Sequence, residues 1–212
     1  MTYARDVAAL ARKDLLLELR ARDTLPAMLL FVVAALVIFH FALPAESGDL
    51  AAKGLLWVAI VFTALLGLGR AFAAERDQGM LDALVLTPCD RSAIWLGKTL
   101  AVLAFLAAAE MVALPAFAVF FSGIGWATVA GVALADVGIA AVGTLVAAMA
   151  VAGKARELLL PLLFLPLAIP AIAGGVGASV VDDPGRYLAF LALYDAVFAL
   201  LAWATFEYVV TE

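Results

Sequence analysis

Four ionisable side chains lie within stretches of the sequence that are otherwise almost entirely apolar: His40, Glu110, Asp136 and Asp195. A charged side chain at the centre of a bilayer costs at least about 2.5–3.5 kcal/mol on insertion scales, so such groups usually face protein or water. They could line a substrate path or relay protons. They could also be structural, as carboxyl groups that are paired, protonated or hydrogen-bonded across helices, and this is the interpretation that we favour.

The residue types give little support for metal, haem or catalytic chemistry. The chain has one histidine and one cysteine, Cys89, so a multi-histidine metal site is excluded and a haem would lack obvious axial ligands. No Ser/His/Asp set and no HExxH motif occur. Residues 92–99 end as a phosphate-binding loop ends, but Ser92 stands where that loop requires glycine. We therefore expect no catalysis, no metal or cofactor held by this chain, and no nucleic-acid binding.

The composition of the chain indicates that the four ionisable side chains lie within a membrane. Of the 212 residues, 67% are hydrophobic and only 15% are charged, whereas soluble domains carry about 25% charged residues. Six apolar stretches are each long enough to cross a hydrocarbon core as a helix. The sequence therefore predicts an all-α, polytopic membrane protein with six transmembrane helices in residues 26–212, at approximately 26–43, 50–73, 99–122, 126–152, 158–178 and 187–210.

The basic residues predict the orientation of these spans. Thirteen Lys and Arg residues occur: five lie in the N-terminal segment, four within residues 70–98 and two in the turn at 153–157, which alternating spans place on one side. Lys53 and Arg186 fall on the other side. By the positive-inside rule the N-terminus, residues 70–98 and the turn at 153–157 are cytoplasmic. Six crossings then return the C-terminus to the cytoplasm of a bacterial cell, with the spans in its inner membrane.

Residues 1–25 precede the first span and form a separate N-terminal segment. Arg5 and Arg12 are seven residues apart, as are Lys13 and Arg20, so the four basic groups share one face of a helix. Leucines occupy much of the remaining surface. This pattern predicts an amphipathic helix that lies in the membrane interface. The alternative is a cytosolic leader whose charges only set the topology.

The only long polar interruption of the apolar sequence is residues 70–98. Its middle part predicts a short amphipathic helix, with Leu81 and Leu84 on the apolar side. Pro88 ends that helix, because proline disfavours helical geometry in the preceding residue. Asp90 or Ser92 then caps a second helix that starts near residue 93. We expect a soluble partner to grip the cytoplasmic segment 74–98.

Two further stretches carry small or helix-breaking residues. The fifth span contains Pro161, Pro166 and Pro170 followed by three glycines, and we interpret it as a kinked helix that ends early and re-enters, or else as a simple proline-kinked span. Gly131 and Gly138 in the fourth span are seven residues apart, which lets another helix approach one face. That helix could belong to this chain or to a second copy. The scattered tryptophans are typical of interfacial belts.

With this topology, the chain resembles the membrane subunits of ATP-binding-cassette exporters, and most closely the haem exporter protein B (CcmB) family. The resemblance covers essentially the whole chain. It rests on RKDLLLELR at 12–20, FAAERDQGMLDALVLTP at 72–88, GK at 97–98 and LLLPLLFLPLAIP at 158–170. The proline-rich motif is more specific than the loop motif.

The resemblance implies a role for the cytoplasmic loop and a set of partners. The loop would be a coupling helix that docks in a cleft of the ATPase and contributes, from this chain, Glu75, Arg76, Asp77, Gly79, Leu81, Asp82, Leu84 and Pro88. The partners would be a CcmA-type ATPase that binds ATP and Mg²⁺, a second copy of the chain, the membrane proteins CcmC and CcmD, and the haem chaperone CcmE. Haem would be carried by the partners. The complex would export haem or release the haem-loaded chaperone.

Two alternatives remain open at this stage. The same architecture could export another cargo, such as a lipid, glycan or drug. A proton-coupled transporter could instead use the intramembrane carboxylates without any ATPase, but residues 70–98 would then have no explained role.

Overall fold

The computed structural model describes residues 3–44, 48–72, 89–121, 123–152 and 156–211. In these residues the chain forms seven helices, and six of them are long and apolar enough to cross a membrane. They are α1 (Tyr3–Ala21), α2 (Thr24–Ala42), α3 (Gly48–Arg70), α6 (Arg91–Phe120), α7 (Trp126–Ala152), α8 (Arg156–Val180) and α9 (Gly185–Thr211). The predicted all-α fold with six spans is confirmed.

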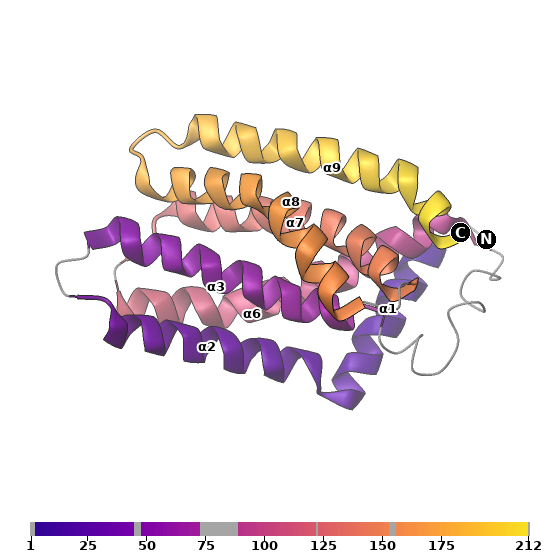
Figure 1. Ribbon diagram of the computed structural model, residues 1–212, viewed down its shortest axis with the longest axis horizontal. Helices are drawn as coiled ribbons and strands as arrows, with labels where there is room; N and C mark the ends of the chain where they lie inside the picture. The colour runs from indigo at the N-terminus through magenta and orange to yellow at the C-terminus, as the bar shows by residue number, and fades with distance from the viewer. Residues whose placement is uncertain (1–2, 45–47, 73–88, 122, 153–155, 212) are drawn as a thin grey trace.

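The six long helices lie side by side and α1 crosses one end of the bundle, as Figure 1 shows. Both termini lie at this end, which we call the α1 end. The end of α3 and the start of α6 also lie there, so the α1 end gathers the segments for which the sequence predicts a common side of the membrane.

Helix α7 occupies the centre of the bundle and contacts α3, α6, α8 and α9. Its glycines allow this close packing. An added Cβ at Gly138 would overlap Tyr194 and Asp195 of α9, and one at Gly131 would lie 3.5 Å from Ala178 of α8. Both glycines are therefore used for contacts within the chain.

Helix α8 is continuous from Arg156 to Val180 and contains all three prolines. The structure contradicts the interpretation of this stretch as a helix that ends early and re-enters. It has the alternative, a single span that continues through its prolines. The ribbon of α8 changes direction along its length (Figure 1), as expected where proline removes backbone hydrogen bonds. Tyr194 of α9 donates its hydroxyl to the Leu167 carbonyl in this region, at 2.8 Å.

Two of the four tryptophans are buried in the bundle, so the expectation that all of them suit the interface is wrong. Trp57 is fully buried; its Nε1 donates to Ser179 Oγ at 3.3 Å, and that hydroxyl donates to the Gly175 carbonyl at 2.7 Å. Trp95 donates to the Ala141 carbonyl at 3.1 Å. Each indole N–H thus has an acceptor inside the protein, which a buried donor requires.

Replacement of Gly175 by alanine tests the packing of α3 on α8. The new methyl group would overlap the Trp57 indole, and overpacking of this kind costs about 1–3 kcal/mol. We expect the melting temperature of the detergent-solubilised protein to fall by several degrees, because 1 kcal/mol corresponds to about 2–4 °C in a chain of this size.

Gly54→Ala is the matched control, because Gly54 lies in the same helix as Trp57 and no atom lies within 4 Å of a Cβ added to it. This change should leave the melting temperature unchanged or raise it, since alanine favours helix over glycine by about 1 kcal/mol. Equal melting temperatures for the two variants would contradict the described packing.

Candidate functional site

The predicted coupling residues belong to the connection from α3 to α6. All eight fall in residues 73–88, outside the described residues: Glu75, Arg76, Asp77, Gly79, Leu81, Asp82, Leu84 and Pro88. The structure describes both ends of this connection, Ala71 and Phe72 after α3 and Cys89 and Asp90 before α6. The geometry of the candidate site is therefore the geometry of these two ends and of the residues that hold them.

Asp90 begins α6 as its N-cap. Its Oδ1 accepts hydrogen bonds from the Ser92 backbone amide at 2.8 Å and from the Ser92 hydroxyl at 2.7 Å. Both bonds stabilise the ionised carboxylate, the bond from the Ser92 hydroxyl more than the bond from its amide. They hold the pKa of Asp90 below its ordinary value. Of the two cap residues predicted from sequence, the structure has Asp90, and the helix begins at Arg91, two residues before the predicted start.

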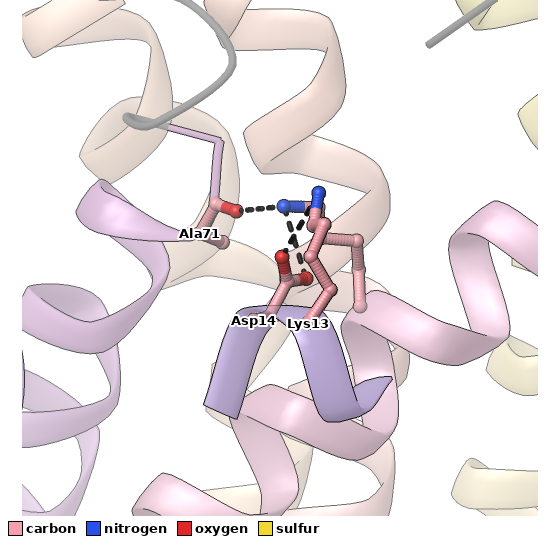
Figure 2. Close-up of polar contacts among 4 residues, drawn as sticks. Lys13, Asp14 and Ala71 are labelled. Carbon is pink, nitrogen blue, oxygen red and sulfur yellow. Dashed lines mark hydrogen bonds and ion pairs between the residues drawn. The ribbon is translucent and has the colours of Figure 1, made fainter. Parts of the chain in front are cut away.

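Lys98, two turns into α6, contacts both α1 and the residues after α3 with one ammonium group. Figure 2 shows two of its partners, Asp14 and the Ala71 carbonyl. The Lys98 side chain is 4% exposed, and its Nζ lies 3.0 Å from Asp14 Oδ2 of α1. The same Nζ donates to the Ala71 carbonyl at 2.7 Å, and it lies 4.9 Å from the centre of the Phe72 ring. A buried cation is tolerated because a carboxylate, a carbonyl and an aromatic face surround it. We call Lys98, Asp14 and Ala71 the charged junction.

Helix α1 is also fastened to the first two turns of α6, in the residues that precede this junction. Tyr3 and Ser92 share a hydrogen bond between their hydroxyls at 3.1 Å. Gly97 allows the backbones to approach closely, since an added Cβ would lie 2.7 Å from Leu10 Cβ and 3.3 Å from the Val7 carbonyl oxygen. The amphipathic helix predicted from sequence therefore packs on the bundle through a polar and apolar face.

Glu18 connects α1 to the start of α2. Its Oε1 accepts hydrogen bonds from the backbone amides of Thr24 and Leu25 at 2.7 and 2.8 Å. The next residue, Pro26, has no amide hydrogen, so most of the donors that the first turn of a helix leaves unpaired are accounted for. Proline is therefore tolerated at this position in the first turn of α2.

A cavity of about 320 Å³ opens beside the junction, between α1, α2, α3 and α6. Its charged lining includes an ion pair at 3.9 Å between Arg70 and Asp23, which are 50% and 66% exposed. Gly67, Val102 and Phe105 supply apolar walls. Charged side chains at the α1 end thus face a hydrated space at the edge of the bundle.

The three intramembrane acids predicted from sequence are brought together in the bundle. Glu110 of α6 and Asp136 of α7 are buried and lie close enough together to interact. Asp195 of α9 lies against Gly138, close enough to Asp136 for the two to interact electrostatically. Glu110 also borders a small cavity between α2, α3 and α6.

His40 does not join these acids. It is exposed near the end of α2, among phenylalanine rings whose centres lie 5.4–5.7 Å from the imidazole: Phe41, Phe120 and Phe121. Among the described residues no group of three His, Cys, Asp or Glu side chains has the arrangement of a metal site.

Sequence reasoning missed the junction and the cap on α2. Asp14 and Glu18 are conspicuous as acids on an otherwise leucine-rich surface, and Lys98 begins the third apolar stretch. These interruptions were a usable signal, because a charge on an apolar face needs a partner. Their pairing could not be read from spacing.

Comparison with known proteins adds a sequence relationship over nearly the whole chain. The sequence model of the family described as "CcmB protein" matches residues 5–209. A relative from Paracoccus denitrificans, named "Heme exporter protein B", is 31% identical over 207 residues, covering 93% of this chain and 94% of the relative. Relatives of the same name from Rhodobacter capsulatus and Pseudomonas aeruginosa are each 32% identical, covering 79% and 80% of this chain and 79% and 78% of their own lengths.

Substitution of Asp90 tests the start of α6. Asp90→Ala removes the acceptor for the Ser92 amide, and loss of an N-cap costs about 0.5–2 kcal/mol. We expect amide hydrogen exchange in residues 91–94 to become severalfold faster at neutral pH, whereas Asp90→Asn, which retains a capping oxygen, should change it much less.

The pH dependence follows from the lowered pKa of Asp90. A carboxyl group whose pKa is lower in the folded state stabilises that state above its unfolded pKa and loses this contribution as the pH falls through the folded value. The Ala variant and the parent should therefore converge in acid. A constant difference at all pH values would contradict the assignment.

Proposed function

The chain belongs to the CcmB protein family, and from this membership we propose that it is the non-catalytic membrane subunit of an ATP-driven complex for cytochrome c maturation. The family match over residues 5–209 is the observation that carries the proposal. The names of the relatives supply the cargo class, haem. The six membrane-length helices supply the setting, a multi-pass membrane protein.

The energy source in this proposal is a partner. A CcmA-type ATPase binds ATP and Mg²⁺, and its closure pushes on the amphipathic segment between α3 and α6. Leu81 and Leu84 offer the apolar contact, Gly79 permits close approach, and the neighbouring charges meet the cleft wall: Glu75, Arg76, Asp77 and Asp82. Support comes from the position of both ends of this segment at the α1 end, next to the charged junction.

The proposed complex exports haem or releases the haem-loaded chaperone CcmE, and the partners hold the haem. The assembly contains a second copy of this chain together with CcmC and CcmD.

We place the protein in the bacterial inner membrane with the α1 end in the cytoplasm. Of the thirteen Lys and Arg residues, eleven belong to segments that begin or finish at that end (Figure 1). Basic residues of this kind are retained on the cytoplasmic side during insertion. The ATPase would then find its docking segment on the side where ATP is available.

A pair of acidic substitutions in the coupling segment tests the function. Leu81→Asp with Leu84→Asp places two charges in the apolar contact with the ATPase. In a bacterium that lacks its own family member, we expect the parent chain, supplied with its partner ATPase, to restore covalent haem attachment to a c-type cytochrome reporter. The double Asp variant should lower the yield at least tenfold and abolish stimulation of the ATPase.

Leu81→Met with Leu84→Met is the control for this experiment, because it preserves an apolar surface of similar volume. It should retain at least half of the reporter yield. Failure of the parent chain to restore the reporter, with the ATPase present in the purified complex, would redirect the proposal to another cargo. Normal stimulation by the double Asp variant would overturn the coupling role.

The single cysteine gives a direct test of orientation. Cys89 is partly exposed and immediately precedes α6. A membrane-impermeant maleimide should label it in inverted vesicles but not in intact cells whose outer membrane has been permeabilised. In a Cys89→Ser background, a cysteine at Asp183, in the turn between α8 and α9, should show the opposite pattern. Labelling of Cys89 from outside would reverse the topology.

A further inference from the structure

The charged junction connects the two ends of the segment proposed to receive the push of the ATPase. Ala71 is the second-last described residue before residues 73–88, and Lys98 lies in the helix that follows them. The hydrogen bond from Lys98 Nζ to the Ala71 carbonyl, at 2.7 Å, therefore connects the residues that precede this segment to the helix that follows it. The contact of Nζ with the Phe72 ring adds a second link to the same end.

Asp14 adds α1 to this connection. Its Oδ2 lies 3.0 Å from Lys98 Nζ, and the two side chains are 11% and 4% exposed. Lys13, the preceding residue, contacts the other oxygen of the same carboxylate at 3.2 Å but is 40% exposed. Because separation of a buried ion pair leaves a charge without a partner in a medium of low polarity, the contact of Asp14 with Lys98 resists opening far more than the exposed one.

The remaining contacts of α1 make it a rigid strap rather than a loosely attached helix. It is bonded to α6 through Tyr3 and Ser92, packed on Gly97, and bonded to the start of α2 through Glu18. A displacement at either end of residues 73–88 therefore acts on α1, α3 and α6 together, because all three are joined at Lys98.

We propose that Lys98 and Asp14 are positioning residues that make α1, the end of α3 and the start of α6 move as one body, so that force entering through the segment between them reaches the membrane helices. This inference rests on the proposed function. Without the junction, the two ends of the segment would move separately, and ATP hydrolysis would continue with little productive movement.

The test measures product per ATP in the assembled complex. The chain and its partner ATPase are purified together for each variant, and the melting temperature, the amount of bound ATPase and the ATP turnover are recorded. The yield of matured c-type cytochrome reporter in the same cells is divided by the ATPase activity. A residue that served only folding would change assembly or melting temperature, but not this ratio.

For Lys98→Met and for Asp14→Asn we expect bound ATPase within twofold of the parent and at least half of its ATP turnover. The reporter yield per ATP should fall about tenfold. The double variant should be no worse than either single variant, because residues that act as one unit are not additive. Lys13→Met, which removes the exposed cation from the same carboxylate, should keep the ratio within twofold.

An assembled Lys98→Met complex with the parent's ratio would overturn the inference and leave the proposed function standing. Additive losses in the double variant would also overturn it. If neither single variant assembles and the exchange variant, Asp14→Lys with Lys98→Asp, does, the pair serves folding alone and the inference is again wrong. A parent complex that matures no reporter would instead count against the proposed function itself.

Discussion

A hydrocarbon core offers no water to a polar group, so each buried donor, acceptor and charge of this chain must find its partner inside the protein. Several of the described contacts follow this constraint. The indole of Trp57 donates to a serine hydroxyl, and the Tyr194 hydroxyl donates to a backbone carbonyl. Lys98 is the most demanding case, because it carries a full charge, and it is met by Asp14 of α1 and by Ala71 and Phe72 after α3.

The interior of the bundle is arranged so that large side chains from one helix meet small residues of another. Glycines receive Trp57 on α8, Tyr194 on α7 and Leu68 on α7. In a membrane the lipid is as apolar as the protein core, so association of helices depends on such close packing and on hydrogen bonds between them. Helix α7 combines both, which explains its central place among four neighbours.

Sequence patterns predicted the spans and the cap at Asp90 because these depend on local composition. They did not predict which faces of the spans point inward. In α6 and α7 almost every position is apolar, so periodicity carries no signal. The burial of Trp95 was missed for this reason. The pairing of Asp14 with Lys98 was missed because it joins residues far apart in the chain. The sequence allowed pairing among Glu110, Asp136 and Asp195 as one of several structural interpretations, but it did not show that they meet.

The docking of α1 on α6 has a consequence for how the protein is made. Asp14 leaves the ribosome well before Lys98, and at about 5–20 residues per second the interval is roughly 4–17 s. During that time α1 has no partner surface, while α2 and α3 are already entering the bilayer. An amphipathic helix suits this wait, because it can rest among lipid headgroups with its acids hydrated. Helix α1 can dock on α6 only after that helix has been made, so the tertiary structure at that end cannot mature co-translationally until the third hydrophobic segment has been inserted.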